Sequence, residues 1–130
     1  MELAQAEAAS ASAGGWGARV SPGITIRRRS STVLQYAIYH PYSTEVYRIL
    51  EGSGTLVTGG RLELPLSESM SLDVVRGEKG IKGGLAQKVS VGDVLVLQPG
   101  TPHWFSDIDG DSITYMETRI RITTHPVHYQ

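Results

Sequence analysis

The chain alternates between short runs rich in apolar and β-branched residues and clusters of glycine, proline, aspartate and serine. From Ile24 onward, apolar side chains tend to recur at every second position within each run, a pattern typical of strands. The runs are ITIRR, TVLQYAIYH, EVYRIL, GTLVTGG, LELPL, SLDVVRG, GLAQKVS, DVLVLQPG and SITYMETRIRIT. The glycines at 52 and 54 and the Asp109–Gly110 pair are interpreted as turns between strands. Many short strands without a long helical pattern predict an all-β barrel or sandwich.

Residues two apart in a strand share a face. In the run that begins at Glu45, this rule places Tyr47 and Ile49 on the same face as Glu45, while Val46 and Leu50 lie on the opposite face. Both faces are therefore partly apolar. A barrel whose outer face is also covered fits this pattern, and we expect a homodimer formed through sheet-to-sheet contact. The alternative is that the N-terminal arm covers the outer face.

Length and composition predict one domain with an arm and a tail. The 130 residues divide into an Ala-rich N-terminal arm (1–23, partly helical or flexible), a barrel (24–122) and a C-terminal tail (123–130). There is no cysteine, which excludes disulfides and thiolate metal sites. The net charge of −1 gives no overall attraction to nucleic acid or anionic lipid, so neither partner is expected.

The start of the chain lacks both a basic segment and a long apolar segment, so it does not have the pattern of an intact signal peptide. No stretch approaches the roughly 18 apolar residues of a membrane helix. We expect a cytoplasmic protein; an exported mature form without its signal peptide is the alternative.

Three residues near strand ends have the chemistry of metal ligands. His40 and Glu45 flank a short segment that contains Pro41 and Ser43, and His103 follows the turn Pro99–Gly100–Thr101–Pro102. Two neutral imidazoles and one carboxylate form a good ligand set for a first-row divalent metal, with coordination positions left open. Each residue also has an interpretation without metal. His103 is then a turn histidine, His40 a buried histidine at a strand end, and Glu45 an exposed edge-strand glutamate paired with Arg48 or Lys88.

These residues resemble the two motifs of the cupin superfamily. The first motif ends in a histidine, a glutamate and a glycine, and His40, Glu45 and Gly52 stand at its spacing. Gly92, Gly100 and His103 stand at the spacing of the second motif, and Pro99 lies one position after the place of the motif's proline. The run EVYRILEGSGTLVTGG is similar to small single-domain cupins of the conserved-barrel (cupin 2-like) type.

The sequence departs from the superfamily pattern at three positions. Ile38 stands where the first motif has another histidine, Gln98 where the second motif has proline, and Asp107 where it has asparagine. The resemblance implies a cupin-type β-barrel (double-stranded β-helix or jelly roll). It also implies a metal site formed by His40, Glu45 and His103 and holding a divalent transition metal (Fe, Mn, Ni, Zn or Co).

The resemblance implies an enzyme that acts on a small organic substrate inside the barrel, with oxygenase, isomerase or lyase-type chemistry. Tyr47 and Tyr36 are the candidates for proton transfer, because a phenol can donate or accept a proton. The substrate pocket is expected to include Ile38, Phe105 and Tyr115. One alternative is a non-catalytic small-molecule-binding protein with a structural metal or none. Another is a metal-free acid–base isomerase or cyclase with His103 as the base.

Other charged residues are given lesser roles. Arg27, Arg28 and Arg29 are consecutive and could touch an anionic substrate or partner. Glu117 and Arg119 share the alternation face of Tyr115 and are interpreted as a paired surface ladder. His125 and His128, in the tail, could supply a further ligand, but a frayed terminus is the simpler interpretation.

Overall fold

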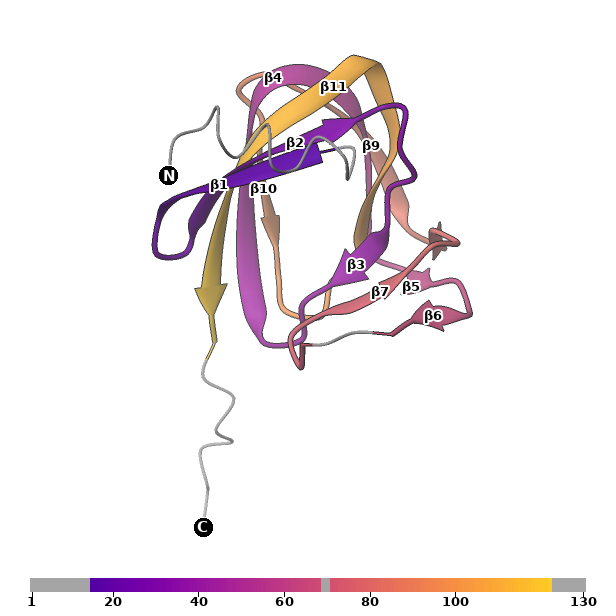
Figure 1. Cartoon of the computed structure of the whole chain (residues 1–130). Coiled ribbons are helices and arrows are strands. Elements are labelled where there is room, and N and C mark those ends of the chain that lie inside the picture. The colour runs from indigo at the N-terminus through magenta and orange to yellow at the C-terminus, as the bar shows by residue number, and fades with distance from the viewer. Residues whose placement is uncertain (1–14, 69–70, 123–130) are drawn as a thin grey trace.

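The computed structural model describes residues 15–68 and 71–122, and Figure 1 shows their arrangement. This part of the chain is all-β, as the sequence predicts. Its strands are β1 (Gly15–Ser21), β2 (Ile24–Ser30), β3 (Ala37–Tyr39), β4 (Ser43–Thr58), β5 (Arg61–Leu62), β6 (Leu66–Ser67), β7 (Val75–Gly77), β8 (Ile81–Lys82), β9 (Leu85–Ser90), β10 (Val94–Leu97) and β11 (His103–Arg121). The described residues contain no helix, and so none that could cross a membrane.

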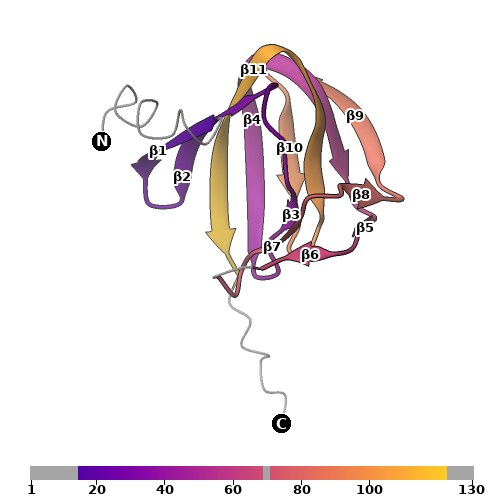
Figure 2. The same cartoon turned by 45° about the vertical axis from the view of Figure 1, so that its right-hand side comes forward.

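Two long antiparallel strands, β4 and β11, run through the whole fold and arch together over its top in Figures 1 and 2. The turns predicted near Gly52 and at Asp109–Gly110 are wrong, because both strands continue through these positions. Gly52 has a φ of +79°, and a Cβ atom there would lie 2.4 Å from the carbonyl oxygen of Ser112. The glycine therefore lets β4 bend against β11; the pairing of the two strands is interrupted at residues 110–113 of β11 and resumes with Thr114 opposite Glu51.

The bend divides the main sheet into two halves that share β4 and β11. In one half, the early part of β4 pairs with β10, and the late part of β11 pairs with β2, which pairs with β1. In the other half, the late part of β4 pairs with β9, and the start of β11 pairs with β3, followed by β7 and β6. The strands β5 and β8 form a separate small sheet.

The hydrophobic core is formed by the inward faces of these strands. The alternation predicted for β4 is confirmed, since Glu45, Tyr47 and Ile49 are buried and Arg48 is exposed. The buried apolar cluster draws on β4, β9, β10 and β11 and consists of Tyr47, Ile49, Leu56, Val89, Leu97, Phe105, Ile108, Ile113 and Tyr115.

The predicted N-terminal arm is partly wrong. Residues 15–21 form β1, which pairs with β2 over nearly its whole length, so they belong to the sheet. The remaining arm, residues 1–14, and the tail with His125 and His128 lie outside the described residues. On the outer face, Val94, Val96 and Ile120 are each more than half exposed. The predicted homodimer stays a prediction.

Candidate metal centre

The three candidate ligands come together from distant parts of the chain. His40 directly follows β3, Glu45 lies near the start of β4, and His103 is the first residue of β11. One carboxylate oxygen of Glu45, Oε1, lies 3.2 Å from His40 Nε2 and 3.2 Å from His103 Nε2. All the potential ligand atoms lie within 4.8 Å of one another. All three residues are buried, with at most 4% of their surface exposed.

Backbone carbonyls fix the orientation of both imidazoles. His40 Nδ1 lies 2.7 Å from the carbonyl oxygen of Asp73, and His103 Nδ1 lies 3.0 Å from that of Thr101. A carbonyl can only accept a hydrogen bond, so each Nδ1 carries the hydrogen and donates it. In a neutral ring, the lone pair is then on Nε2 and points toward Glu45. Metal-binding histidines are commonly held by this kind of contact.

The hydrogen bonding at the centre of the cluster is incomplete. Glu45 Oε1 and His103 Nε2 are buried and have no hydrogen-bond partner among the described residues. Two neutral rings would therefore present lone pairs to a carboxylate oxygen, which is unfavourable without a proton or a cation between them. A second proton on each ring, at Nε2, is the alternative to a cation: burial tends to raise the pKa of Glu45, but hydrogen bonds and positive charge from protonated His103 and His40 outweigh it and hold that pKa well below its usual range. The donor set of two nitrogens and one oxygen fits a divalent transition metal.

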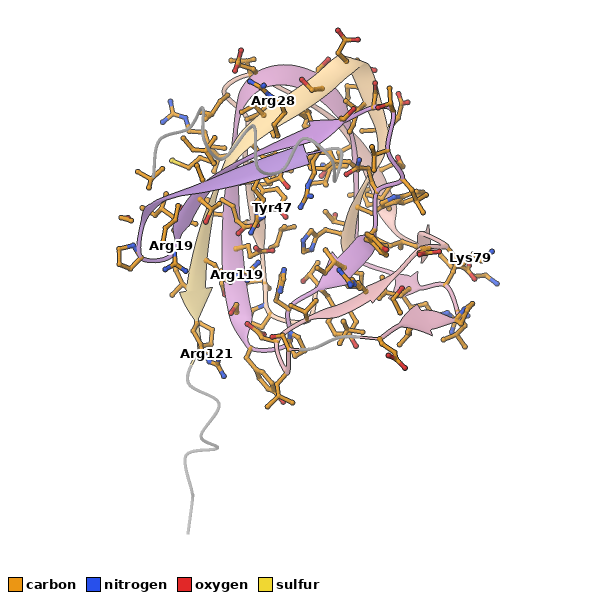
Figure 3. All side chains as sticks on the ribbon, in the orientation of Figure 1. Arg19, Arg28, Tyr47, Lys79, Arg119 and Arg121 are labelled. Carbon is orange, nitrogen blue, oxygen red and sulfur yellow. The ribbon has the colours of Figure 1, made fainter. Side chains whose placement is uncertain are left out.

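Arg119 is the main site residue that the sequence interpretation missed. It lies directly opposite Glu45 in the β4–β11 pairing. Its Nε and Nη2 atoms donate to the second carboxylate oxygen, Oε2, at 3.2 and 3.1 Å, and Nη2 also lies 3.2 Å from His40 Nε2. Figure 3 labels Arg119 and Tyr47, the latter on the same face of β4 as Glu45. Arg119 thus leaves Oε1 of Glu45 free for an ion.

The surface ladder predicted for Glu117 and Arg119 is wrong, because Glu117 is buried. Its carboxylate pairs with Arg27 at 3.1 Å and lies 3.5 Å from Arg119. Burial and the nearby charge of Glu45 raise the pKa of Glu117, although Arg27 and Arg119 oppose the shift. The alternation rule did place Glu117 on the same face of the strand as Tyr115, but nothing in the local sequence indicated which side chains Glu117 would contact.

Asp73 holds the loop between His40 and Glu45 in place. One carboxylate oxygen accepts a hydrogen bond from the Tyr42 amide at 2.6 Å, and the other accepts one from the Ser43 hydroxyl at 2.5 Å. Its backbone carbonyl also accepts the His40 hydrogen. Asp73 is far from the ligands in sequence and belongs to no recognisable spacing.

A cavity of about 300 Å³ adjoins the cluster at His103. Tyr47 stands edge-on to His103, with ring centroids 5.6 Å apart, and burial raises its pKa well above the ordinary phenol value. Tyr36 is 40% exposed, and its hydroxyl donates to Glu78 at 3.3 Å rather than contacting the proposed ligands. The other predicted pocket residues, Ile38, Phe105 and Tyr115, all line this cavity.

The structure also bears on the alternative interpretation of Glu45. Arg48 is exposed on the opposite face of β4, and Lys88 pairs with Asp109. Neither is the partner of Glu45, and Glu45 is not an edge glutamate. It is a buried carboxylate held by Arg119.

No family model matches the chain, and no curated protein matches its sequence. Among solved structures, vicilin from Solanum melongena is similar, with a TM-score of 0.56 and 18% identity over 86% of this chain. The fold is that of a cupin. This cupin-fold chain spans 29% of the vicilin chain, whose structure revealed different anionic ligands in structurally similar pockets.

Two further solved structures match with lower TM-scores. The Drosophila melanogaster CENP-C cupin domain has a TM-score of 0.48 and 12% identity, and the match covers 81% of this chain and 65% of that one. The Streptomyces protein Pac13, a nucleoside dehydratase, has a TM-score of 0.43 and 14% identity, with 85% and 82% covered. These likenesses concern the fold, so the function has to be argued from the residues of this chain.

Proposed function

We propose that this cupin-fold chain is a metal-dependent enzyme that acts on a small organic molecule in the cavity beside His103. The observation that carries the proposal is the convergence of two Nε2 atoms and one carboxylate oxygen, each buried. The histidine hydrogens are held on the far side of the rings by backbone carbonyls. Glu45 Oε1 and His103 Nε2 are costly to bury because they have no hydrogen-bond partner among the described residues, and a divalent ion would satisfy both while also binding His40 Nε2.

In this proposal, His40, Glu45 and His103 hold the ion. A divalent ion bound there supplies a Lewis acid that polarises a substrate oxygen. Such chemistry is common to isomerases and lyases, and a ferrous ion would extend it to oxygenases. Arg119 holds the second oxygen of Glu45, which fixes the carboxylate without using the oxygen that faces the histidines.

Tyr47 is the proposed proton-transfer residue. It lines the cavity and contacts the His103 ring, so a substrate next to the cluster would also be next to the phenol. Because burial raises its pKa, Tyr47 is a neutral hydrogen-bond donor at ordinary pH, able to donate to a developing negative charge on the substrate. Tyr36, at the exposed side of the same cavity, has a second proposed role in orienting the substrate.

The proposal is tested by exposing a mixture of small metabolites to the metal-loaded protein and following their depletion by mass spectrometry. An enzyme depletes its substrate far beyond one molecule per chain and yields a product. The folded His103→Ala variant should lose this turnover, whereas Arg48→Gln, which changes an exposed residue on the opposite face, should retain it. Depletion that stops at one molecule per chain would indicate a binding protein and contradict the proposal.

A second candidate function is metal-free acid–base catalysis. The observation that favours it is the 3.2 Å contact between Arg119 Nη2 and His40 Nε2, which places a guanidinium beside one of the proposed ligands. The chain itself then supplies a cation next to Glu45, with His103 as the base. This candidate predicts turnover that survives exhaustive chelation, whereas the metal-dependent proposal predicts its loss and recovery on adding metal.

A further inference from the structure

Two arginines face the cavity beside the candidate metal centre, one from each half of the sheet. Arg29 comes from β2 and Arg76 from β7, and both line the same space as His103. Arg76 pairs across the sheet with Ile38, which in turn pairs with His103. Directly opposite residues in neighbouring strands project from the same face. The guanidinium of Arg76 and the ring of His103 therefore project from one side of this half of the sheet.

Neither arginine forms a direct ion pair with an acidic side chain among the described residues, although Tyr115 and, less strongly, the charge of Glu117 act on Arg29 and raise its pKa. Arg76 Nε is buried and has no hydrogen-bond partner, and the guanidinium carbon of Arg76 lies 4.8 Å from the centre of the Tyr36 ring. Arg29 is partly buried, and its Nε donates only to the hydroxyl of Tyr115, at 3.2 Å. The neighbouring Arg27 differs, because it forms an ion pair with Glu117. A buried guanidinium donor without an acceptor is costly, and an anion in the cavity would remove that cost.

The remaining walls of the cavity are largely aromatic. Tyr36, Tyr47, Trp104, Phe105 and Tyr115 all line it. Its volume of about 300 Å³ is at the small end of ligand pockets. Flat aromatic walls favour a planar apolar body, and the fork of a guanidinium matches a carboxylate.

We propose that the cavity binds a small planar organic carboxylate, with its carboxylate on Arg29 and Arg76 and its other end toward His103. This inference rests on the proposed function in naming the substrate class of that site. The carboxylate sits on the two arginines, so the binding step itself does not require the metal.

Benzoate is a suitable probe, and benzamide is its neutral counterpart of the same shape. Titration of the full chain in EDTA by calorimetry should give saturable benzoate binding in the millimolar range or tighter, and benzamide should bind at least about tenfold more weakly. Trp104 lies in the cavity wall, and Trp16 is the only other tryptophan. In a Trp16→Phe background, benzoate should therefore change the fluorescence of Trp104 with the same saturation.

Arg76→Gln should weaken benzoate binding about 10- to 100-fold, the loss expected for a hydrogen bond to a charged group. Arg29→Gln should have a similar effect, and Arg76→Lys should recover part of the affinity. The matched control is Arg48→Gln, which removes the same charge from an exposed position and should leave binding unchanged. Circular dichroism shows which variants are folded, and Arg76→Gln carries the test if Arg29→Gln does not fold.

Any one of three results would overturn this inference. They are equal affinity for benzoate and benzamide, equal benzoate affinity in Arg76→Gln and the unmodified chain, and no saturable benzoate binding up to about 50 mM. Zinc binding by the same preparations separates it from the proposed function. Zinc binding without benzoate binding overturns the carboxylate inference alone. Benzoate binding without zinc binding supports the carboxylate inference and contradicts the metal-dependent function.

Discussion

Replacing Glu45 with glutamine removes a negative charge from the buried cluster and nearly preserves the shape of the side chain. The glutamine carbonyl can still accept from Arg119, but the two hydrogen bonds, 3.2 and 3.1 Å long, then no longer join the guanidinium to a carboxylate, and the ion pair is lost. Leaving one partner of a fully buried ion pair unpaired costs about 3–5 kcal/mol. Here the Arg119 side chain is 32% exposed and retains Glu117 at 3.5 Å, so solvent and the second acid reduce the loss. We expect the free energy of unfolding to fall by about 2 kcal/mol.

Urea unfolding in EDTA measures the Glu45–Arg119 interaction without metal. It is carried out on the unmodified chain, Glu45→Gln, Arg119→Gln and the double variant. The double-mutant cycle should give a coupling energy of about 1–2 kcal/mol. The control Arg48→Gln should change stability by no more than about 0.5 kcal/mol. Zinc at about one hundred times its dissociation constant should then stabilise the unmodified chain by about 2.7 kcal/mol and Glu45→Gln by much less.

Two results would refute this reasoning separately. A coupling energy below about 0.3 kcal/mol would mean that Arg119 does not hold the Glu45 carboxylate. Equal zinc stabilisation of the unmodified chain and Glu45→Gln would mean that Glu45 is not a metal ligand, whatever the strength of its ion pair.

Three further substitutions test other parts of the structure. The raised pKa of Tyr47 means that the folded state holds the phenol proton more tightly than the unfolded state, so the free energy of unfolding falls as pH rises past about 10. Tyr47→Phe should flatten this decline when urea unfolding is measured across pH, and the same pH dependence in both proteins would contradict the expectation. Asp73→Ala removes the hydrogen bonds that hold the loop at Tyr42 and Ser43, so calorimetry should show zinc affinity about 10- to 100-fold lower. Unchanged zinc affinity would mean that Asp73 does not help to position the ligands. Leu56→Ala opens a cavity in the fully buried core and should cost about 2–5 kcal/mol in chemical unfolding, while a loss below about 1 kcal/mol would show that the core is loosely packed.

The sequence predicted the strand character and the faces of the strands because alternation is a local property. The shared face of Glu45, Tyr47 and Ile49 follows from their spacing alone. The predicted breaks near Gly52 and at Asp109–Gly110 failed for a physical reason. Glycine permits a tight turn, but it equally permits a bend in a strand whose pairing with its neighbour resumes beyond the bend.

The candidate ligands were predictable because two motifs fix the positions of His40, Glu45 and His103. The role of Arg119 was not predictable, because its contact with Glu45, 74 residues away in the sequence, depends on the register of β4 and β11. Asp73 acts through a loop whose path has no periodicity to read. The sequence therefore indicated which residues come together at the candidate metal centre, and only the register and the loop path showed which residues hold them in place.

Whether His40, Glu45 and His103 hold an ion can be measured by reconstituting the chelator-stripped chain with a divalent transition metal and quantifying the bound ion by elemental analysis and native mass spectrometry. We expect about one ion per chain, lost in folded His40→Ala and His103→Ala variants and retained in Arg48→Gln. Less than about 0.1 ion per chain, or binding unaffected by both histidine substitutions, would contradict it.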